Sequence, residues 1–444
     1  MFIQLVRILC RVALFVVVTY APTLCREKTA LDKIAEKYVK VALTVGLYQA
    51  DFIDAYFGPA EWRPIPNPAE VKNLPYAELK GEVTELLDKL DDIAVNELGS
   101  GGPSRRHHLK KSLMSLGEFL EILNGAKLTF DQESQALYDI ILPVIDTAIY
   151  DSALQKLDRV LPGAGDVSTR LVSFEKQFIV PRDKLDTLMR VALSECRSRT
   201  KNHMGLPSDE TVVLEFVANQ PWWAYNWFKG DSKSLVQIDS SRDVRIGEVL
   251  MLAAHEGYPG HHVAGILTEK QLFRDSGWVE YSVSPLFCPT SILSEGMANY
   301  ALDLIFPLTK RIAFYESVLF PLAGLDTANL TKYIEVSELR DTLGTADAQI
   351  ARKYIDGKIS REEAISQLQH YVGRTLKEAE SGIDFFDRYR AYDITYVVGE
   401  DLVRRFVERK DTSEDTPQAR WVRFSHIITG NLTPQDLVDS TKAR

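Results

Sequence analysis

Apolar residues recur three and four positions apart along most of this chain, whereas strictly alternating runs are scarce. This spacing gives a segment one apolar face, as in an amphipathic helix. We therefore predict a mainly α fold. The clearest helical segments are residues 31–47, 79–93, 113–123, 133–157 and 181–196, and helical spacing returns in the C-terminal third, with breaks at Pro289, Pro307 and Pro321.

Two short segments favour β-structure instead. Residues 211–217 and 234–238 are rich in Val and Leu, and they flank the aromatic stretch 221–227. We predict a small β-sheet or hairpin there, in which 234–238 could accept an extended peptide by edge pairing. The cluster of Trp222, Trp223 and Trp227 either lines a specificity pocket or belongs to a hydrophobic core.

Glycine and proline mark two breaks between helices. Residues 99–104 are predicted to form a flexible loop, and the Pro-Gly-Ala-Gly run at 162–165 forms a second break. The second break is a candidate boundary between an N-terminal helical region, residues 26–165, and the remainder, residues 166–444.

The first 25 residues have the composition of a targeting segment. Arg7 and Arg11 precede the apolar run 12–18, and smaller residues follow. This order is typical of a secretory signal peptide, or of a signal anchor if it is not cleaved. We therefore expect an exported or secreted protein whose only contact with a membrane is such an anchor. Cys196 and Cys288 remain after removal of the leader, and they form one bridge or none.

Charge narrows the classes of partner. The 444 residues are 45% apolar and carry a formal net charge of −10. Binding of nucleic acid needs a basic surface to neutralise phosphates, so no nucleic-acid partner is expected.

The segment 255–262, His-Glu-Gly-Tyr-Pro-Gly-His-His, indicates metal chemistry. It contains three of the chain's eight histidines and one carboxylate, Glu256. Neutral imidazole is a common zinc ligand, and a carboxylate beside the metal is the usual base for a bound water. Apolar spacing over 246–253 places His255 and Glu256 near the end of a helix.

The spacing of the histidines departs from the familiar zinc-peptidase motif, in which two histidines stand four apart. Pro259 occupies that position, and it disrupts the helix because it lacks an N–H. Gly260 permits unusual backbone angles. A bulge that absorbs two residues would make His261 the second ligand, and one that absorbs three would select His262. We favour His261 as the second metal ligand, with His262 next to the ligands but not bound to the metal.

A third protein ligand is expected to come from a second helix. Residues 291–304 have helical spacing, and Glu295 lies on a different face from the apolar stripe. The small residues Gly296 and Ala298 allow close packing of helices, and Asn299 stands one turn on, where it could orient a ligand.

At these residues the sequence resembles the family known as domain of unknown function 885, zinc hydrolases of the gluzincin-like group. The resemblance rests on the motif 254–262 and on 294–296 with Tyr300; less specific matches are 54–62 and 395–399. It implies a zincin-like multi-helix catalytic region over 166–444, with Glu256 as the base and Glu295 as the third ligand. It implies no particular substrate.

We therefore expect a metallopeptidase-like hydrolase with one zinc ion, held by Glu295, His255 and either His261 or His262, which cleaves a peptide or small amide. The family match makes Tyr396 the candidate donor to the oxyanion, with Tyr258 as the alternative. Two other functions stay open: hydrolysis of a small non-peptide amide or ester, and a non-catalytic metal-containing binding protein.

Overall fold

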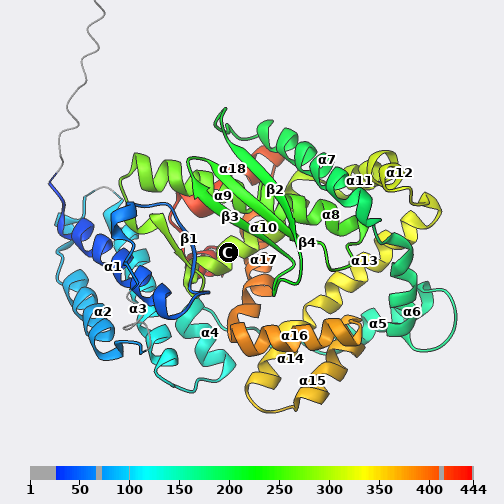
Figure 1. The fold of residues 1–444 in the computed structure, drawn as a ribbon, viewed down its shortest axis with the longest axis horizontal. Coiled ribbons are helices and arrows are strands. Elements are labelled where there is room, and N and C mark those ends of the chain that lie inside the picture. Colours follow the sequence, from blue (N-terminus) through cyan, green and yellow to red (C-terminus); the bar gives the residue numbers. More distant parts are fainter. Residues whose placement is uncertain (1–26, 67–72, 100, 410–414, 443–444) are drawn as a thin grey trace, which may run out of the picture.

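The computed structural model describes residues 27–66, 73–99, 101–409 and 415–442. The leader expected at 1–25 lies outside these residues. The described chain is mainly α-helical with two small sheets, as the apolar spacing predicts (Figure 1). Within the described part, no helix is both long enough and apolar enough to cross a bilayer.

The N-terminal helices form the blue and cyan end of the molecule in Figure 1. α1 (Ala30–Tyr48), α2 (Tyr76–Asp91) and α3 (Gly102–Leu123) confirm three predicted helices. α1 begins at a capping box in which Thr29 and Asp32 exchange hydrogen bonds. The loop predicted at 99–104 is wrong in its second half, because α3 begins at Gly102, and Pro103 lies in its first turn, where a missing N–H costs nothing.

The segment 133–157, which we predicted as one helix, is two. α4 (Phe130–Tyr138) ends at Asp139, which adopts a left-handed backbone conformation with φ 57°. α5 (Ala148–Val160) begins after an irregular stretch that contains Pro143. Proline disfavours a continuous helix, although the apolar spacing on either side is helical. α6 (Val167–Glu175) and α7 (Arg182–Lys201) follow, and α7 confirms the helix predicted at 181–196.

Three strands form the sheet predicted before the histidine-rich segment. β2 (Thr211–Val217) runs parallel to β4 (Lys233–Asp239), and β3 (Ala224–Gly230) forms an antiparallel hairpin with β4. Their order is β2-β4-β3, so both edges of β4 are already paired. Edge pairing of a peptide with 234–238 is therefore wrong, and β3 is an outer strand instead. A second sheet pairs β1 (Ile53–Tyr56) with β5 (Val283–Pro285), which the sequence did not indicate.

The C-terminal half is helical. Its helices are α8 (Ile246–Leu252), α9 (His261–Leu267), α10 (Pro289–Ile305), α11 (Leu308–Phe314), α12 (Phe320–Ala323), α13 (Leu330–Gly344), α14 (Ala346–Ile355), α15 (Arg361–Gln367), α16 (Leu376–Tyr389), α17 (Ile394–Val407), α18 (Pro417–Thr429) and α19 (Pro434–Lys442). α10 and α17 lie behind the three-stranded sheet at the centre of Figure 1.

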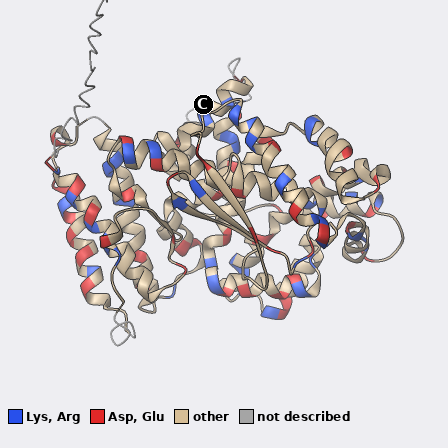
Figure 2. Cartoon of the chain, turned by 45° about the horizontal axis from the view of Figure 1, so that its top comes forward, with Lys and Arg blue, Asp and Glu red and all other residues tan. Residues whose placement is uncertain are grey.

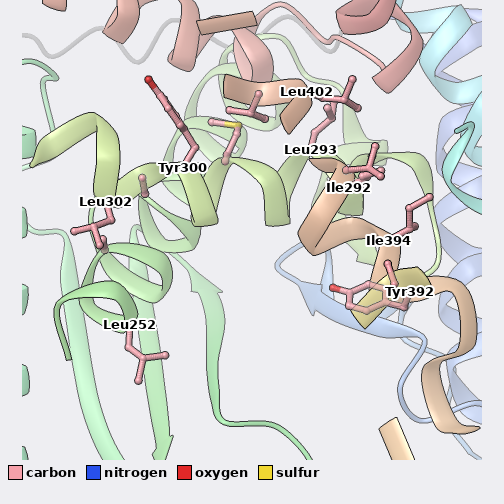
Figure 3. Close-up of a cluster of buried hydrophobic side chains, with 14 of the residues drawn as sticks. Leu252, Ile292, Leu293, Tyr300, Leu302, Tyr392, Ile394 and Leu402 are labelled. Atoms are coloured by element: carbon pink, nitrogen blue, oxygen red, sulfur yellow. The ribbon is translucent and has the colours of Figure 1, made fainter. Parts of the chain in front are cut away.

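The packing of α10 against α17 forms the middle of the core. In Figure 3, Leu293 and Tyr300 of α10 lie near Leu402 of α17. A Cβ atom added at Gly296 would overlap the backbone of Gly399, and one added at Gly399 would overlap the carbonyl of Ile292. Only glycines allow this separation. Gly296, which was predicted to let its helix approach the histidine-bearing helix, makes its close contact with Gly399 of α17.

One continuous hydrophobic cluster runs through the described chain, and it includes residues on both sides of position 165, such as Leu157 of α5 and Leu343 of α13. Lysine and arginine are interspersed with acidic residues along the outer helices in the view of Figure 2. Cys196 and Cys288 are buried and unbridged.

Candidate functional site

The histidine-rich segment interrupts a helix. α8 ends at Leu252 and continues as a π-helical turn, Ala253–Gly257, after which Tyr258 is extended. The Tyr258–Pro259 peptide is cis, and α9 resumes at His261. Gly260 is required because a Cβ at this position would overlap the carbonyl oxygens of His255 and Ala254.

This interruption brings two imidazoles together. The Nε2 atoms of His255 and His261 are 3.2 Å apart, although six positions separate the residues. The geometric effect is the one expected for a bulge that selects His261: both rings point into one space, with their planes nearly perpendicular at 86°.

Glu295 of α10 completes a group of three. Its Oε2 atom lies 3.4 Å from His255 Nε2 and 3.7 Å from His261 Nε2. The three candidate ligand atoms all lie within 4.8 Å of one another. Tetrahedral zinc with bonds of about 2.0–2.1 Å separates its ligands by roughly 3.3 Å, so the three atoms suit a single ion.

Neighbouring side chains orient this group. The hydroxyl of Tyr392 donates to Glu295 Oε1 at 2.9 Å, and Ser294 Oγ lies 3.3 Å from His261 Nδ1. Glu295 Oε2 is buried and has no hydrogen-bond partner among the described residues. A buried carboxylate oxygen without a partner is costly, and a cation at this point would satisfy it.

The charges of the group are interdependent. Burial raises the pKa of Glu295, but the two histidines outweigh it and hold this pKa well below its usual range. Burial lowers the pKa of His261, and the charge of Glu295 more than reverses this, raising it to about 9. Without a cation, the proton on His261 therefore takes the place that a metal would occupy.

Glu256 stands beside this group as a buried carboxyl. It is 5% exposed, and its Oε2 atom has no hydrogen-bond partner among the described residues. Burial raises its pKa, while the charges of His255 and His261 lower it. The amide of Asn226 on β3 donates to the carbonyl oxygen of Glu256 and so ties this turn to the sheet.

Tyr396 projects from α17 into the same cavity. Its ring lies 5.7 Å from that of Tyr392, edge to face. Burial raises its pKa well above 10, so its hydroxyl stays protonated and able to donate. Asn299, which we predicted could orient a metal ligand, instead donates to the carbonyl oxygen of Tyr396 at 3.1 Å and anchors α17.

His262 lies outside the group, contrary to its inclusion among the candidate metal ligands. Its Nδ1 lies 2.8 Å from Ser234 Oγ and its Nε2 lies 3.1 Å from Glu210 Oε2. Because α9 turns its ring about 100° away from that of His261, His262 faces the sheet. Both ring nitrogens are occupied, so His262 anchors the turn.

The hydroxyl of Tyr258, the alternative donor to an oxyanion, is likewise engaged in a hydrogen bond within the protein. Its hydroxyl donates to Glu210 Oε2 at 2.5 Å, and Arg197 Nε donates to Oε1 at 2.5 Å. Burial raises the pKa of Glu210, but hydrogen bonds from His262, Tyr258 and Arg197 outweigh it and lower this pKa to about 2. Tyr258 therefore has no free donor for a substrate.

The group opens into a cavity of about 580 Å³. β1, β3, α9, α10, α16 and α17 all contribute to its wall, as do α1 and α3 from the N-terminal helices. Trp222 and Trp227 line it, whereas Trp223 packs against the core, so the tryptophan cluster is divided between the two roles considered.

Three further residues of this cavity were not predicted from the sequence: Tyr392, Asp54 and Tyr225. Asp54 accepts a short hydrogen bond from the hydroxyl of Tyr225, across 171 positions of sequence. Asp54 lies in the segment 54–62, which was noted only as part of the resemblance. Nothing in the spacing of the three residues indicates that they meet.

No family model matches this chain, and no curated protein matches it in sequence. A solved structure described as a "putative lipoprotein", from Colwellia psychrerythraea, aligns with a TM-score of 0.49 at 15% identity over 82% of this chain. One described as a "putative lipoprotein of unknown function", from Shewanella oneidensis, aligns with a TM-score of 0.48 at 13% identity, over 95% of this chain and 89% of that one. The chain spans 65% of the Colwellia protein. These similarities are too distant to assign a function.

Proposed function

We propose that this protein is a metal-dependent hydrolase of peptide bonds that binds one zinc ion through His255, His261 and Glu295. The observation that supports this most directly is the convergence of three ligand atoms around a partnerless, buried carboxylate oxygen. Three protein ligands that leave one position open are typical of a catalytic rather than a structural zinc site.

A zinc ion bound there would polarise the substrate carbonyl and lower the pKa of a coordinated water. Glu256 is the general base: its Oε2 atom takes a proton from the attacking water and passes it to the leaving amine. Its burial raises its pKa, which helps the carboxylate to hold the proton between the two transfers. Tyr396 keeps its proton and donates a hydrogen bond to the developing oxyanion.

The cavity also suits a smaller substrate. A volume of about 580 Å³ lies within the range typical of small-molecule pockets, so a short peptide or a small amide fits better than an extended protein segment. Small non-peptide amides and esters are therefore the second candidate class of substrate.

The test separates metal binding from catalysis. We expect purified protein to contain about one zinc per chain by elemental analysis, and Glu256→Gln to retain it while hydrolysis of a peptide panel falls by at least about 100-fold. Glu97→Gln, a change of the same kind on the surface, is the control for the loss of one charge. Zinc retained with no hydrolysis of any peptide, amide or ester by the wild type would favour the binding role instead. Absence of zinc would contradict the whole proposal.

A further inference from the structure

Asp54 is a carboxylate of the cavity that lacks a cationic partner. It lies on β1, and its one strong neighbour is the hydroxyl of Tyr225 on β3. Among the described residues, no lysine or arginine contributes to the pKa shift of Asp54. Its side chain is accessible from the cavity, so a ligand can reach it.

Each of the other acidic residues of the cavity has a positively charged partner, either an arginine or the proposed metal ion. Asp51 accepts two hydrogen bonds from Arg388, at 2.7 and 2.8 Å. Glu280 accepts two from Arg105, at 2.6 and 2.8 Å. Glu256 and Glu295 carry two negative charges, which a divalent ion balances. With a divalent ion bound, Asp54 would be the one charge without a counterpart among the described residues of the cavity wall.

Asp54 is connected through β3 to the backbone of Glu256, the candidate general base. Tyr225, which holds it, is the neighbour along β3 of Asn226, and Asn226 binds the backbone of Glu256. Burial raises the pKa of Asp54 and outweighs the opposite effects of the Tyr225 hydrogen bond and of the His261 charge. An ammonium group beside Asp54 would favour the ionised carboxylate.

Aromatic rings gather around Tyr225, the hydrogen-bond partner of this carboxylate. The ring of Tyr225 lies 5.5 Å from that of Trp222 and 4.5 Å from that of Trp227, and all three residues line the cavity together with Asp54. A cavity that combines a carboxylate with aromatic rings suits an ammonium group, which pairs with the charge and also interacts with ring faces.

We propose that Asp54, held by Tyr225, binds the protonated amino terminus of a short peptide, so that the enzyme cleaves close to the N-terminal end of its substrate. This rests on the proposed function, because it supplies the substrate class of the same site. Asp54 contributes to binding and specificity rather than to proton transfer.

The test compares one tetrapeptide with a free amino terminus and the same peptide with an acetylated one. We expect the wild type to prefer the free peptide about 10- to 100-fold in kcat/KM, the value of one charge-assisted hydrogen bond. Asp54→Asn keeps the shape and should reduce this preference to less than about threefold, mainly by raising KM for the free peptide. Tyr225→Phe should weaken the preference by a smaller factor.

Two controls accompany the comparison. Asp92→Asn removes an equal charge from an exposed position at the end of α2 and should keep the full preference. Zinc content of Asp54→Asn should equal that of the wild type, which shows that the metal site is intact.

Calorimetric binding of both peptides to the zinc-loaded Glu256→Gln protein separates the two proposals. Preferential binding of the free peptide, without hydrolysis by the wild type, would support the role of Asp54 and contradict the hydrolase. Equal hydrolysis of both peptides would contradict the role of Asp54 and leave the hydrolase standing. Binding of neither peptide would overturn the role of Asp54.

Discussion

The hydrogen bond from Tyr392 to Glu295 determines which oxygen of that carboxylate faces the histidines. Because Oε1 accepts from the tyrosine at 2.9 Å, Oε2 is the atom that points toward His255 and His261. Partners behind the ligands of a metal site commonly change affinity by 10- to 100-fold when they are removed.

We therefore expect Tyr392→Phe to weaken zinc binding by about 10- to 100-fold, measured by competition with a chelator of known affinity. Tyr333→Phe is the matched control. Tyr333 is also a buried tyrosine, whose hydroxyl accepts one hydrogen bond from the backbone N–H of Gly247 at 3.0 Å. Both variants should lose about 1 kcal/mol of stability, but only Tyr392→Phe should lose metal affinity. Equal affinities would show that Tyr392 does not position Glu295.

At this scale the sequence indicated the candidate ligands better than their partners. His255, Glu256, His261 and Glu295 stand out because imidazoles and carboxylates are concentrated at 255–262 and Glu295 lies on a second helix. Whether His261 or His262 turns toward Glu295 depends on how the chain leaves and re-enters a helix around Gly260, which spacing leaves undecided. The role of Tyr392 depends on a contact across 97 positions, for which a single sequence offers no signal.

Among the elements, the pair α10 and α17 determines the site. α10 carries Glu295, while α17 and the turn before it carry Tyr396 and Tyr392. Their separation is set by Gly296 against Gly399, where the two backbones touch. An added methyl group has no space there, so it must push the helices apart and move Tyr392 away from Glu295.

We expect Gly296→Ala to destabilise the fold by about 1–3 kcal/mol, as overpacking of a core does, and also to weaken zinc binding. Gly81→Ala in α2 is the control, since a Cβ there meets nothing within 4 Å. It should stabilise the protein by about 0.5–1 kcal/mol through helix propensity alone and leave zinc affinity unchanged. Denaturant unfolding and chelator competition measure the two effects. A stable Gly296→Ala protein with full affinity would contradict this account of the helix pair.

Prediction of the elements succeeded where one apolar face continued and failed where the chain was interrupted. α1, α2 and α7 follow their apolar stripes, and β2 and β4 follow the Val- and Leu-rich segments at 211–217 and 234–238. β3 begins within the aromatic stretch between them, which was not predicted to be a strand. The helix expected at 133–157 divides because a local break at Pro143 outweighs spacing that continues on either side. The pairing of β1 with β5 is not local in sequence, so no pattern within either strand predicts it.

For the whole molecule, the site joins distant parts of the chain. The N-terminal helices α1 and α3, β1 and the C-terminal helices all contribute to the cavity wall. The hydrophobic cluster is continuous across position 165, so the region predicted at 26–165 contributes wall to a site whose ligands all lie beyond 254. A metal ion that links α10 to the turn before α9 should therefore stabilise the folded chain, and this stabilisation should depend on pH.

The pKa of His261 determines whether stabilisation by the metal increases or decreases with pH. Its pKa is raised to about 9 in the metal-free protein, whereas an unfolded histidine titrates near 6.5. The proton on His261 therefore stabilises the metal-free fold fully below about pH 6.5, and this contribution is lost as the pH rises toward 9. Zinc binding must displace the same proton, so zinc affinity rises about tenfold for each pH unit in this window.

At a fixed excess of zinc, we expect the difference in unfolding free energy between the zinc-loaded and metal-free proteins to grow by about 1.4 kcal/mol per pH unit between pH 6.5 and 8.5. Thermal or denaturant unfolding with and without zinc measures it, and calorimetry in buffers of different ionisation enthalpy should detect about one proton released per zinc at pH 7. His370→Gln, which removes an exposed histidine far along the chain, should keep the slope. His261→Gln should abolish both the slope and most of the stabilisation, because it removes the proton and a ligand together. A stabilisation by zinc that stays constant across this window would mean that the ion binds somewhere other than between His255, His261 and Glu295.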